Sequence, residues 1–476
     1  MFDDFRSFIE YLSVVGELKK IDGADWDLEI GTITELFGER RGPALLFDEI
    51  KDYPTGFRIA SNVIMTPRRQ RIALGIPEAL PEVEIIRDWK DRLKQIKPVP
   101  PREVATGPVM ENVLTGKNVD LLKFPTPRWG ELDGGRYIGT GDVTITKDPD
   151  EGWVNCGTYR IMLHDQKTLA FHSSPGKHAN IIRQKYWAKG ENCPVVMSFG
   201  EDMLLFTMST IGFPWGVPEL DVAGYMKGKP IDVIKGPITG LPIPATAEIA
   251  IEGFSPPPSV DGRPEGPIGE WTGYYASGSR TEPVVQVKAI YHRNDPILHG
   301  QPPVKPPLNS WFPIPLHSTV MLWNRLEVNG IPGIRSVCMH GPGSRVVAVI
   351  SIKQQYLGHA KQVGVLTASL LSGNSHGRWV IIVDEDIDPS DWESVMWAVT
   401  TRCDPETSVE IVRGFLSSRL DPTIPPEKRE RGDFTTAKVI INACKPYHWM
   451  KDFPPVNVAS DELRKKILDK WPSLFV

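Results

Sequence analysis

The chain has 476 residues, long enough for about three domains at roughly 150 residues each. Hydrophobic residues make up 41% of the sequence and charged residues 24%, as in an ordinary globular protein. The formal net charge of -5 gives no electrostatic reason to expect nucleic acid or an anionic membrane as a partner. A small-molecule ligand is therefore the first expectation.

The cysteine content and the lengths of the apolar runs predict the cellular compartment of the protein. The five Cys residues never form a C-x-x-C pair, so neither a disulfide framework nor a zinc ribbon is indicated. The first residues carry acids, and no window approaches 18 uninterrupted apolar residues. We therefore expect a cytoplasmic protein without a secretory signal or a membrane span.

The first hundred residues predict alternating helices and strands. Apolar residues recur at intervals of three and four over 3–16 and again from Ile30 to Phe37, which is the spacing of an amphipathic helix. A short apolar run at 44–47 predicts a strand. We expect an N-terminal α/β domain over 1–115, ending in proline-rich chain that begins near 98.

The middle of the chain is predicted to be mostly β. Period-two runs that predict strands lie at 142–146, 158–163, 245–251 and 283–291. Gly and Pro at the turns favour a barrel or a sandwich, interrupted by one helix at about 177–189. We expect this domain to span 116–305.

The last third returns to alternating elements. Helices are predicted near 316–328, 359–371 and 390–400, and strands at 345–352, 378–383 and 408–412. This order is typical of βαβ units with a parallel sheet, which we expect over 306–476. A final amphipathic helix at 461–471 either packs back on the body or reaches a second subunit.

Two acids lie on irregular backbone. The segment 264–275 reads PEGPIGEWTGYY and places Glu265 and Glu270 among glycines and prolines, where catalytic side chains often lie. Arg160 is the candidate cation for this pair. A cation lowers the pKa of one carboxyl and burial raises that of the other, which can divide the roles of base and acid. The alternative is a pair of solvated loop acids.

A second set of residues suits a cation. Lys177 and His178 directly precede a helical run, and a helix N-terminus binds anions, although a simple polar cap has the same pattern. Glu219 follows a Gly- and Pro-rich loop, and Asn155 adds an amide oxygen. Together Asn155, His178 and Glu219 form a mixed oxygen and nitrogen set that suits Mg²⁺ or Mn²⁺, but spacing alone does not establish the site.

Other catalytic templates are absent or misplaced. The sequence contains neither G-x-x-x-x-G-K-[ST] nor H-E-x-x-H. One G-x-S-x-G occurs at 373–377, but it lies between a predicted helix and the next strand, whereas a nucleophile elbow requires strand, turn and helix in that order. We interpret it as a loop that ends a helix.

The motifs together resemble a known family. Asn155-x4-Arg160, Lys177-His178, Glu219 and the segment PEGPIGE occur in the order found in UbiD-like decarboxylases, which use prenylated FMN. The resemblance covers most of the chain. It implies an α/β plus β fold with three parts: an N-terminal α/β unit, a central split β-barrel of flavin-reductase type that binds the flavin, and a C-terminal α/β oligomerisation unit.

The resemblance also implies ligands. Asn155, His178 and Glu219 are expected to hold a divalent cation, usually Mn²⁺, which ties the cofactor phosphate to the protein, and K⁺ is expected near Ser209, Ile211 and Glu219. The residues expected to line prenylated FMN are Asn155, Gly157, Thr158, Tyr159, Arg160, Lys177, His178, Ser209, Thr210, Ile211, Gly212, Glu219 and Lys438.

Arg160, Glu265 and Glu270 correspond to the catalytic trio of the family, with Glu270 as the proton donor. The implied reaction is reversible, non-oxidative decarboxylation of an aromatic, heteroaromatic or α,β-unsaturated acid through a covalent adduct with prenylated FMN, which serves as electron sink. A flavin prenyltransferase supplies the cofactor, and the assembly is a homodimer or larger. The alternatives are an FMN-dependent oxidoreductase on the same barrel and a cofactor-binding subunit without turnover.

Three residues bear on substrate choice. The indole of Trp271 could stack on an aromatic acid or shorten the space for it. Asn309 and His317 lie in the segment expected near the substrate, where His317 either hydrogen-bonds the substrate or simply begins a helix. We favour a small aromatic or heteroaromatic acid over a long enoic acid.

Overall fold

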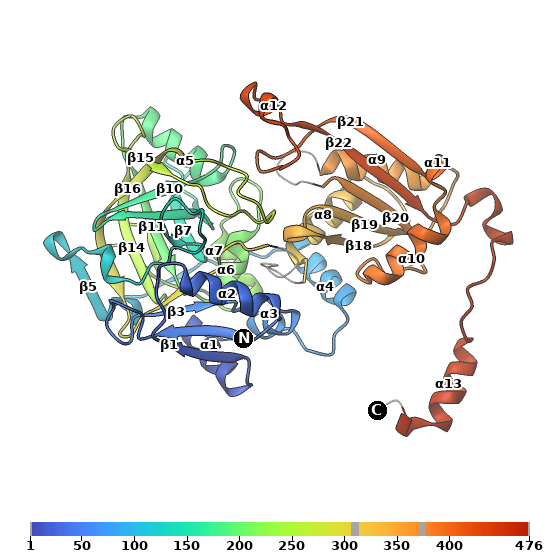
Figure 1. Ribbon diagram of the computed structural model, residues 1–476, viewed down its shortest axis with the longest axis horizontal. Coiled ribbons are helices and arrows are strands. Elements are labelled where there is room, and N and C mark those ends of the chain that lie inside the picture. The colour runs from blue at the N-terminus through green and yellow to red at the C-terminus, as the bar shows by residue number, and fades with distance from the viewer. Residues whose placement is uncertain (1, 306–313, 372–376, 475–476) are drawn as a thin grey trace.

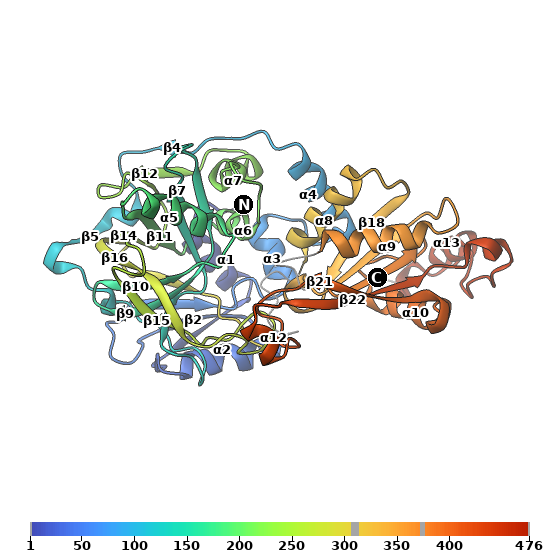
Figure 2. The ribbon, with the colours of Figure 1, turned by 90° about the horizontal axis from the view of Figure 1, so that it is seen from above.

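The computed structural model describes residues 2–305, 314–371 and 377–474, and Figures 1 and 2 show them as two lobes. One lobe holds the N-terminal sheet and the β-rich middle of the chain. The other holds the C-terminal sheet with its helices, drawn from yellow-orange to red. The motif at 373–377 lies mostly outside the described residues.

The N-terminal sheet has four strands in the order β1-β2-β3-β17. Its elements are β1 (Leu18–Asp22), β2 (Ala44–Asp48), β3 (Arg58–Ser61), β17 (Ile297–Gly300), α1 (Phe5–Val14), α2 (Glu29–Glu39) and α3 (Pro67–Leu74). The helices and the strand predicted in this region are confirmed. The fourth strand, β17, pairs in parallel with β3 but follows the β-rich middle of the chain, so the two parts share one body.

Helix α4 (Glu82–Lys94) precedes the barrel in sequence but packs against α8 (Leu316–Val328) of the other lobe. The Lys90 ammonium bonds Glu327 at 2.6 Å and lies 4.8 Å from the centre of the Trp323 ring. This contact ties the beginning of the chain to the C-terminal lobe.

The central sheet has ten strands and is curled, with the order β6-β9-β10-β16-β14-β11-β7-β8 and with β5 and β15 paired to the long strand β16. The strands are β5 (Asn112–Thr115), β6 (Arg136–Gly139), β7 (Asp142–Lys147), β8 (Val154–Gly157), β9 (Arg160–Asp165), β10 (Thr168–His172), β11 (Cys193–Phe199), β14 (Ile249–Ser255), β15 (Gly262–Glu265) and β16 (Arg280–His292). A small sheet, β13-β12-β4, is built from β4 (Arg102–Glu103), β12 (Asp232–Lys235) and β13 (Pro242–Pro244).

Three helices accompany the barrel: α5 (His178–Ala188), α6 (Met203–Thr210) and α7 (Glu219–Lys227). Helix α5 is the one predicted at about 177–189, and it begins at His178 as its sequence indicates. Strand β8 packs against both α5 and α7, so the first residues of two helices meet one strand. This junction positions the candidate metal ligands.

The C-terminal sheet has the order β18-β19-β20-β22-β21, which corrects the prediction of a parallel sheet. Its elements are β18 (Ile334–His340), β19 (Val347–Ile352), β20 (Trp379–Asp384), β21 (Val409–Leu416), β22 (Thr435–Ala443), α9 (His359–Leu370), α10 (Trp392–Arg402), α11 (Pro405–Ser408) and α12 (Pro426–Glu430). Strands β19, β20 and β22 are parallel, but β18 and β21 are antiparallel edges. The physical reason is that β19 turns back along β18, and β22 turns back along β21, whereas parallel neighbours require a crossover to the opposite end of the sheet.

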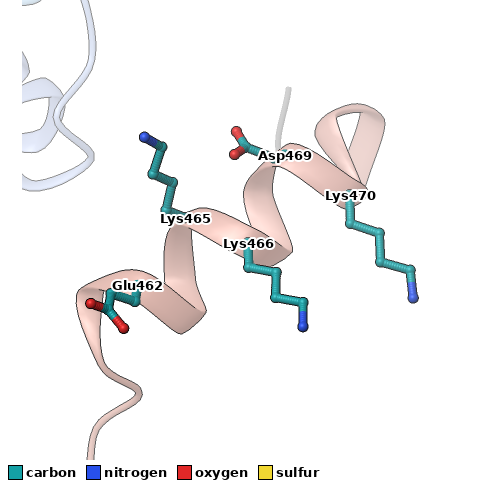
Figure 3. A pocket seen from close by; sticks show the side chains of 5 residues that line it. All are labelled: Glu462, Lys465, Lys466, Asp469 and Lys470. Atoms are coloured by element: carbon teal, nitrogen blue, oxygen red, sulfur yellow. The ribbon is translucent and has the colours of Figure 1, made fainter.

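Helix α13 (Asp461–Lys470) lies apart from both lobes at the end of an extended segment (Figure 1). It does not pack back on the described body, and its residues are exposed. Lys466 and Lys470 extend to one side of the helix and Lys465 to the other (Figure 3), so the hollow among them is an open charged surface and not an enclosed site. Nowhere in the described chain is a helix both long and apolar enough to cross a bilayer.

Candidate active site

The structure brings Arg160, Glu265 and Glu270 together. Arg160 begins β9, Glu265 ends β15, and Glu270 lies in the irregular loop that follows. One guanidinium nitrogen of Arg160 contacts Glu265 Oε2 at 2.6 Å, and another contacts Glu270 Oε1 at 2.7 Å. A planar guanidinium is well suited to hold two carboxylates at fixed positions.

The two carboxyls of the trio have different surroundings. The Glu265 side chain is fully buried, and its Oε1 accepts a hydrogen bond from the Tyr137 hydroxyl at 3.1 Å. Burial raises the pKa of Glu270 above its ordinary value, and this effect outweighs the opposing charge of Arg160. Burial alone would lower the pKa of Arg160, but the two carboxylates outweigh it and raise that pKa. The solvated-loop alternative is therefore wrong for these acids.

A second layer of charge lies behind the trio. His172 Nδ1 lies 2.9 Å from Glu282 Oε1, and one ligand atom each of His172, Glu265 and Glu282 fall within 4.8 Å of one another. Each of the two carboxylates already forms an ion pair with an arginine. Arg160 pairs with Glu265, and Arg280 pairs with Glu282. A metal ion here would have to displace these cations, so we interpret the cluster as an ion-pair network.

Asn155 lies on β8, and His178 and Glu219 begin the two helices, α5 and α7, that pack against this strand. Asn155 and Glu219 are each 2% exposed. Glu219 Oε2 accepts the Cys156 backbone N–H at 2.8 Å, yet burial raises the pKa of Glu219 to about 8. No lysine or arginine of the described chain forms an ion pair with this carboxyl. A buried acid without a countercharge fits a divalent cation.

The imidazole of His178 lies between two indoles. Its ring centre is 5.4 Å from that of Trp153 and 5.3 Å from that of Trp215, both edge to face. Burial and the nearby Lys177 charge lower the pKa of His178. The ring is therefore neutral at pH 7 and keeps a nitrogen lone pair, which is the form that binds metals.

Cationic side chains from both lobes face the same region. Lys177 is accessible to solvent but surrounded by protein on most sides, and this desolvation, with the charge of Arg345, lowers its pKa to about 8. Desolvation and the nearby Arg345 and Lys177 charges lower the pKa of His317 to about 3. The region suits an anion such as a phosphate group. Arg345 escaped the sequence analysis, although its place after the glycine-rich run at 341–344 was a usable signal.

The turn that ends α6 contacts the C-terminal lobe. His317 Nε2 accepts the Gly212 N–H at 3.3 Å, so His317 is more than the first polar residue of a helix. The Ser209 and Thr210 hydroxyls donate to the carbonyls of their own helix at 2.9 and 2.7 Å, which leaves their oxygen lone pairs available.

Tyr159 and Gly157 shape the backbone next to Asn155. The Tyr159 hydroxyl accepts the Ala179 N–H of α5 at 3.3 Å. A Cβ atom on Gly157 would lie 2.6 Å from the Tyr159 ring, so only glycine fits there. Thr158 lies between them. These contacts hold the end of β8 and the start of β9 beside the N-terminus of α5.

Two other predicted residues contact the C-terminal lobe, where the Trp271 ring centre lies 5.6 Å from the Arg345 guanidinium, and a third is not described. Lys438 is buried in β22, where its ammonium donates to the Ala368 carbonyl at 2.8 Å. Trp271 lies against the C-terminal lobe, where a Cβ on Gly343 would be 2.9 Å from its ring. Asn309 is outside the described residues. The roles of Lys438, Trp271 and Asn309 stay predictions.

Family models match nearly the whole chain. They are the N-terminal domain (residues 9–93), the Rift-related domain (102–306) and the C-terminal domain (316–443) of 3-octaprenyl-4-hydroxybenzoate carboxy-lyase. The chain belongs to the UbiD family. The predicted enzyme class, a carboxy-lyase, is confirmed.

Two curated UbiD relatives are similar over their full lengths. A phenolic acid decarboxylase of Streptomyces sp. (strain D7) is 31% identical, over 94% of this chain and 92% of its own. A pyrrole-2-carboxylic acid decarboxylase of Pseudomonas aeruginosa is 30% identical, over 98% and 97%. Decarboxylation of aromatic or heteroaromatic acids is thus the activity class of the UbiD enzymes to which the chain is similar.

Solved UbiD structures confirm the predicted fold class. The UbiD-class enzyme HmfF from Pelotomaculum thermopropionicum, in complex with FMN, has a TM-score of 0.83 and 27% identity, covering 98% of this chain and 99% of its own. An evolved dimeric form of HmfF, in complex with prFMN, has a TM-score of 0.80 and 26% identity, covering 98% of each chain. The curled barrel between α/β elements therefore has flavin-binding counterparts.

Proposed function

We propose that the chain is a prenylated-FMN-dependent decarboxylase of a small aromatic or heteroaromatic acid, with Glu270 as the proton donor. The observation that carries this proposal is the contact of Arg160 with two buried carboxyls, of which Glu270 has a raised pKa. A group that must donate a proton near neutral pH needs such an environment. The names of the relatives support the substrate class.

The cofactor would lie where the barrel meets the C-terminal lobe. When bound, prenylated FMN supplies the electrophile and electron sink that decarboxylation at an sp² carbon requires. Asn155, His178 and Glu219 would hold a divalent cation such as Mn²⁺ beside the phosphate, and Lys177 and Arg345 would add positive charge. The uncompensated Glu219 carboxyl and the neutral His178 ring fit this assignment.

Further ligands and partners follow from the same proposal. K⁺ would bind near Ser209, Ile211 and Glu219, and Lys438 would approach the flavin from the C-terminal lobe. A flavin prenyltransferase would supply the cofactor, and the enzyme would form a homodimer or a larger assembly.

The chain's own residues divide the work of the reaction. Tyr137 and Arg160 hold the Glu265 carboxylate in place, and Arg160 also fixes the direction of Glu270. In the proposed reaction Glu270 is protonated when CO₂ leaves, and it then delivers this proton to the carbon that CO₂ has left. The side chains of the trio are at most 12% exposed, so the proton comes from a defined atom and not from bulk water.

The two alternative functions find less support. An FMN-dependent oxidoreductase would consume NAD(P)H and would give Glu265 and Glu270 no task. A cofactor-binding subunit without turnover is expected to have lost part of the trio, whereas Arg160, Glu265 and Glu270 are all present and in contact.

The test compares Glu270→Gln with the surface change Glu131→Gln, both co-expressed with a flavin prenyltransferase. Glu270→Gln should retain the cofactor, as mass spectrometry of the bound chromophore will show, but lose CO₂ release and deuterium exchange into the product. Glu131→Gln should behave like the wild type. Wild-type turnover in Glu270→Gln would refute the donor assignment.

A second experiment tests the metal bridge. His178→Ala should lose metal and flavin together, measured by metal analysis and by flavin absorbance after gel filtration. Full flavin occupancy in a metal-free variant would contradict the bridge.

A further inference from the structure

A cavity of about 190 Å³ lies beside Glu270, between α2 and the loops of the barrel. Glu35 of α2 and Lys305 contribute to its lining, with Asp133, Glu270 and Tyr275. Its lining does not include Arg160, Lys177, His178 or Arg345, so among the described residues it is separate from the cation-lined region between the lobes. Of the trio, Glu270 alone lines it.

Asp133 connects this cavity to the loop that carries Glu270. The Asp133 carboxylate is 6% exposed and accepts the Gly130 N–H at 2.8 Å. The Gly269 N–H and the Tyr275 hydroxyl also lie near this carboxylate, where both oppose the rise in its pKa. Gly269 directly precedes Glu270 in the chain. Asp133 therefore lies beside the neighbour of the donor and beside a hydroxyl in the cavity wall.

Asp133 and Tyr275 have the electrostatics of proton carriers. Burial raises the pKa of Asp133 above its ordinary value, despite its hydrogen-bond donors. Burial and the Asp133 charge raise the pKa of Tyr275 to about 12, so its hydroxyl stays protonated. No described lysine or arginine forms a salt bridge with Asp133, so a proton on this carboxyl does not break an ion pair.

The proton donor, Glu270, must be reprotonated in every catalytic cycle. When Glu270 gives its proton to the product carbon it becomes a carboxylate, and one proton must enter from solvent before the next turnover. The side chains of Arg160 and Glu270 are each only 12% exposed, so solvent reaches Glu270 through a limited opening. A cavity of this size has room for several waters, and polar groups in its wall can hold them.

We propose that this cavity is the route by which Glu270 regains its proton, with water passing the proton from solvent along Tyr275 and Asp133 to the Glu270 carboxylate. Asp133 and Tyr275 are positioning residues that act through Glu270. The inference rests on the proposed donor role of Glu270 and extends it to the source of the proton.

The kinetic test uses Asp133→Asn and Tyr275→Phe in the cofactor-loaded enzyme. Asp48→Asn is the matched control, because Asp48 is a buried acid that accepts the Gly56 N–H at 2.8 Å in the N-terminal sheet. Asp133→Asn should keep the wild-type rate for the first turnover but lose about tenfold in steady-state kcat, because only recharging is slowed. Its solvent deuterium isotope effect should increase, and millimolar imidazole should restore turnover as a diffusible proton donor.

A second readout does not depend on turnover. When Glu270 is protonated, its carboxyl gives an infrared band, which is assigned by its absence in Glu270→Gln and which shifts when the protein is transferred to D₂O. Asp133→Asn should slow this shift relative to the wild type and Asp48→Asn.

Distinct results separate the two hypotheses. If Asp133→Asn slows the first turnover as much as later ones and imidazole has no effect, Asp133 only holds the loop and the proton route is refuted. Wild-type kinetics and wild-type infrared exchange in both Asp133→Asn and Tyr275→Phe would also refute it. If Glu270→Gln itself turns over normally, the donor role fails first, and that result is recognisable without the cavity variants.

Discussion

Glu219 is a buried carboxyl that has no positively charged partner among the described residues. Its carboxyl is 2% exposed, has one backbone N–H donor from Cys156, and has a pKa raised to about 8. The sequence predicted this residue as a ligand from its type and from the family resemblance. The raised pKa could not be predicted, because it depends on how completely α7 and β8 exclude water around one carboxyl.

At the residue scale we predict a pH effect on the metal-free protein. The folded state holds the Glu219 proton up to about pH 8, whereas the unfolded chain releases it near its ordinary value of 4.5. The folded state therefore binds more protons between these values, so stability falls as pH rises from about 5 to 8, by roughly 1.4 kcal/mol per pKa unit at most. Urea unfolding at several pH values measures this. The free energy of unfolding of Glu219→Gln should fall less steeply with pH than that of the wild type, and equal slopes in the two proteins would contradict the prediction.

The same residue predicts a pH-dependent metal effect. Mn²⁺ competes with the Glu219 proton, so the rise in Tm on adding Mn²⁺ should be larger at pH 8 than at pH 5. Differential scanning calorimetry at both pH values measures it. Glu427→Gln, at an exposed position, is the control and should respond like the wild type, whereas Glu219→Gln should lose the response.

At the scale of elements, the contact between α8 and the end of α6 crosses the boundary between the lobes. The sequence predicted α8 at its observed bounds but left the role of His317 open, because a single helix-start His has no signal for a partner more than a hundred residues away. The same limit explains the C-terminal sheet. Strands β18 and β22 were not predicted, and these two strands form the antiparallel pairs with β19 and β21 that make the sheet mixed.

His317→Ala should loosen this boundary. The Gly212 N–H loses its acceptor, and because this hydrogen bond is exposed to water its loss costs about 0.5–1.5 kcal/mol. Amide hydrogen exchange at 209–212 should become faster, and Tm should fall. His448→Ala, at an exposed position of the same lobe, should change neither. Unchanged exchange at 209–212 in His317→Ala would show that the contact does not hold the turn.

At the scale of the molecule, α13 is a helix that leaves apolar side chains exposed. Leu463, Ile467 and Trp471 recur at intervals of four and are 48%, 39% and 48% exposed. The sequence predicted this amphipathic helix and left two destinations open. The structure removes one of them, because the helix lies away from the described body (Figure 1).

We predict that a second copy covers this stripe. Removing residues 456–476, or replacing Leu463 and Ile467 by Ser, should shift the protein to a smaller assembly in analytical ultracentrifugation, because exposed apolar side chains of this size favour association. Lys465→Ser, whose side chain extends to the other side of the helix from Lys466 and Lys470, is the control and should keep the wild-type mass (Figure 3). An unchanged mass in the Leu463 and Ile467 variant would contradict the prediction.

The packing of α4 on α8 constrains how the chain can be divided. The chain contributes α4 to the C-terminal lobe, then forms the barrel, and then forms the rest of the C-terminal lobe from α8 onward. A fragment that begins at residue 314 would lack α4 and leave the buried Trp323 without its cover. The C-terminal lobe is therefore not a module that a single cut can release, and any opening of the two lobes must bend two connections at once.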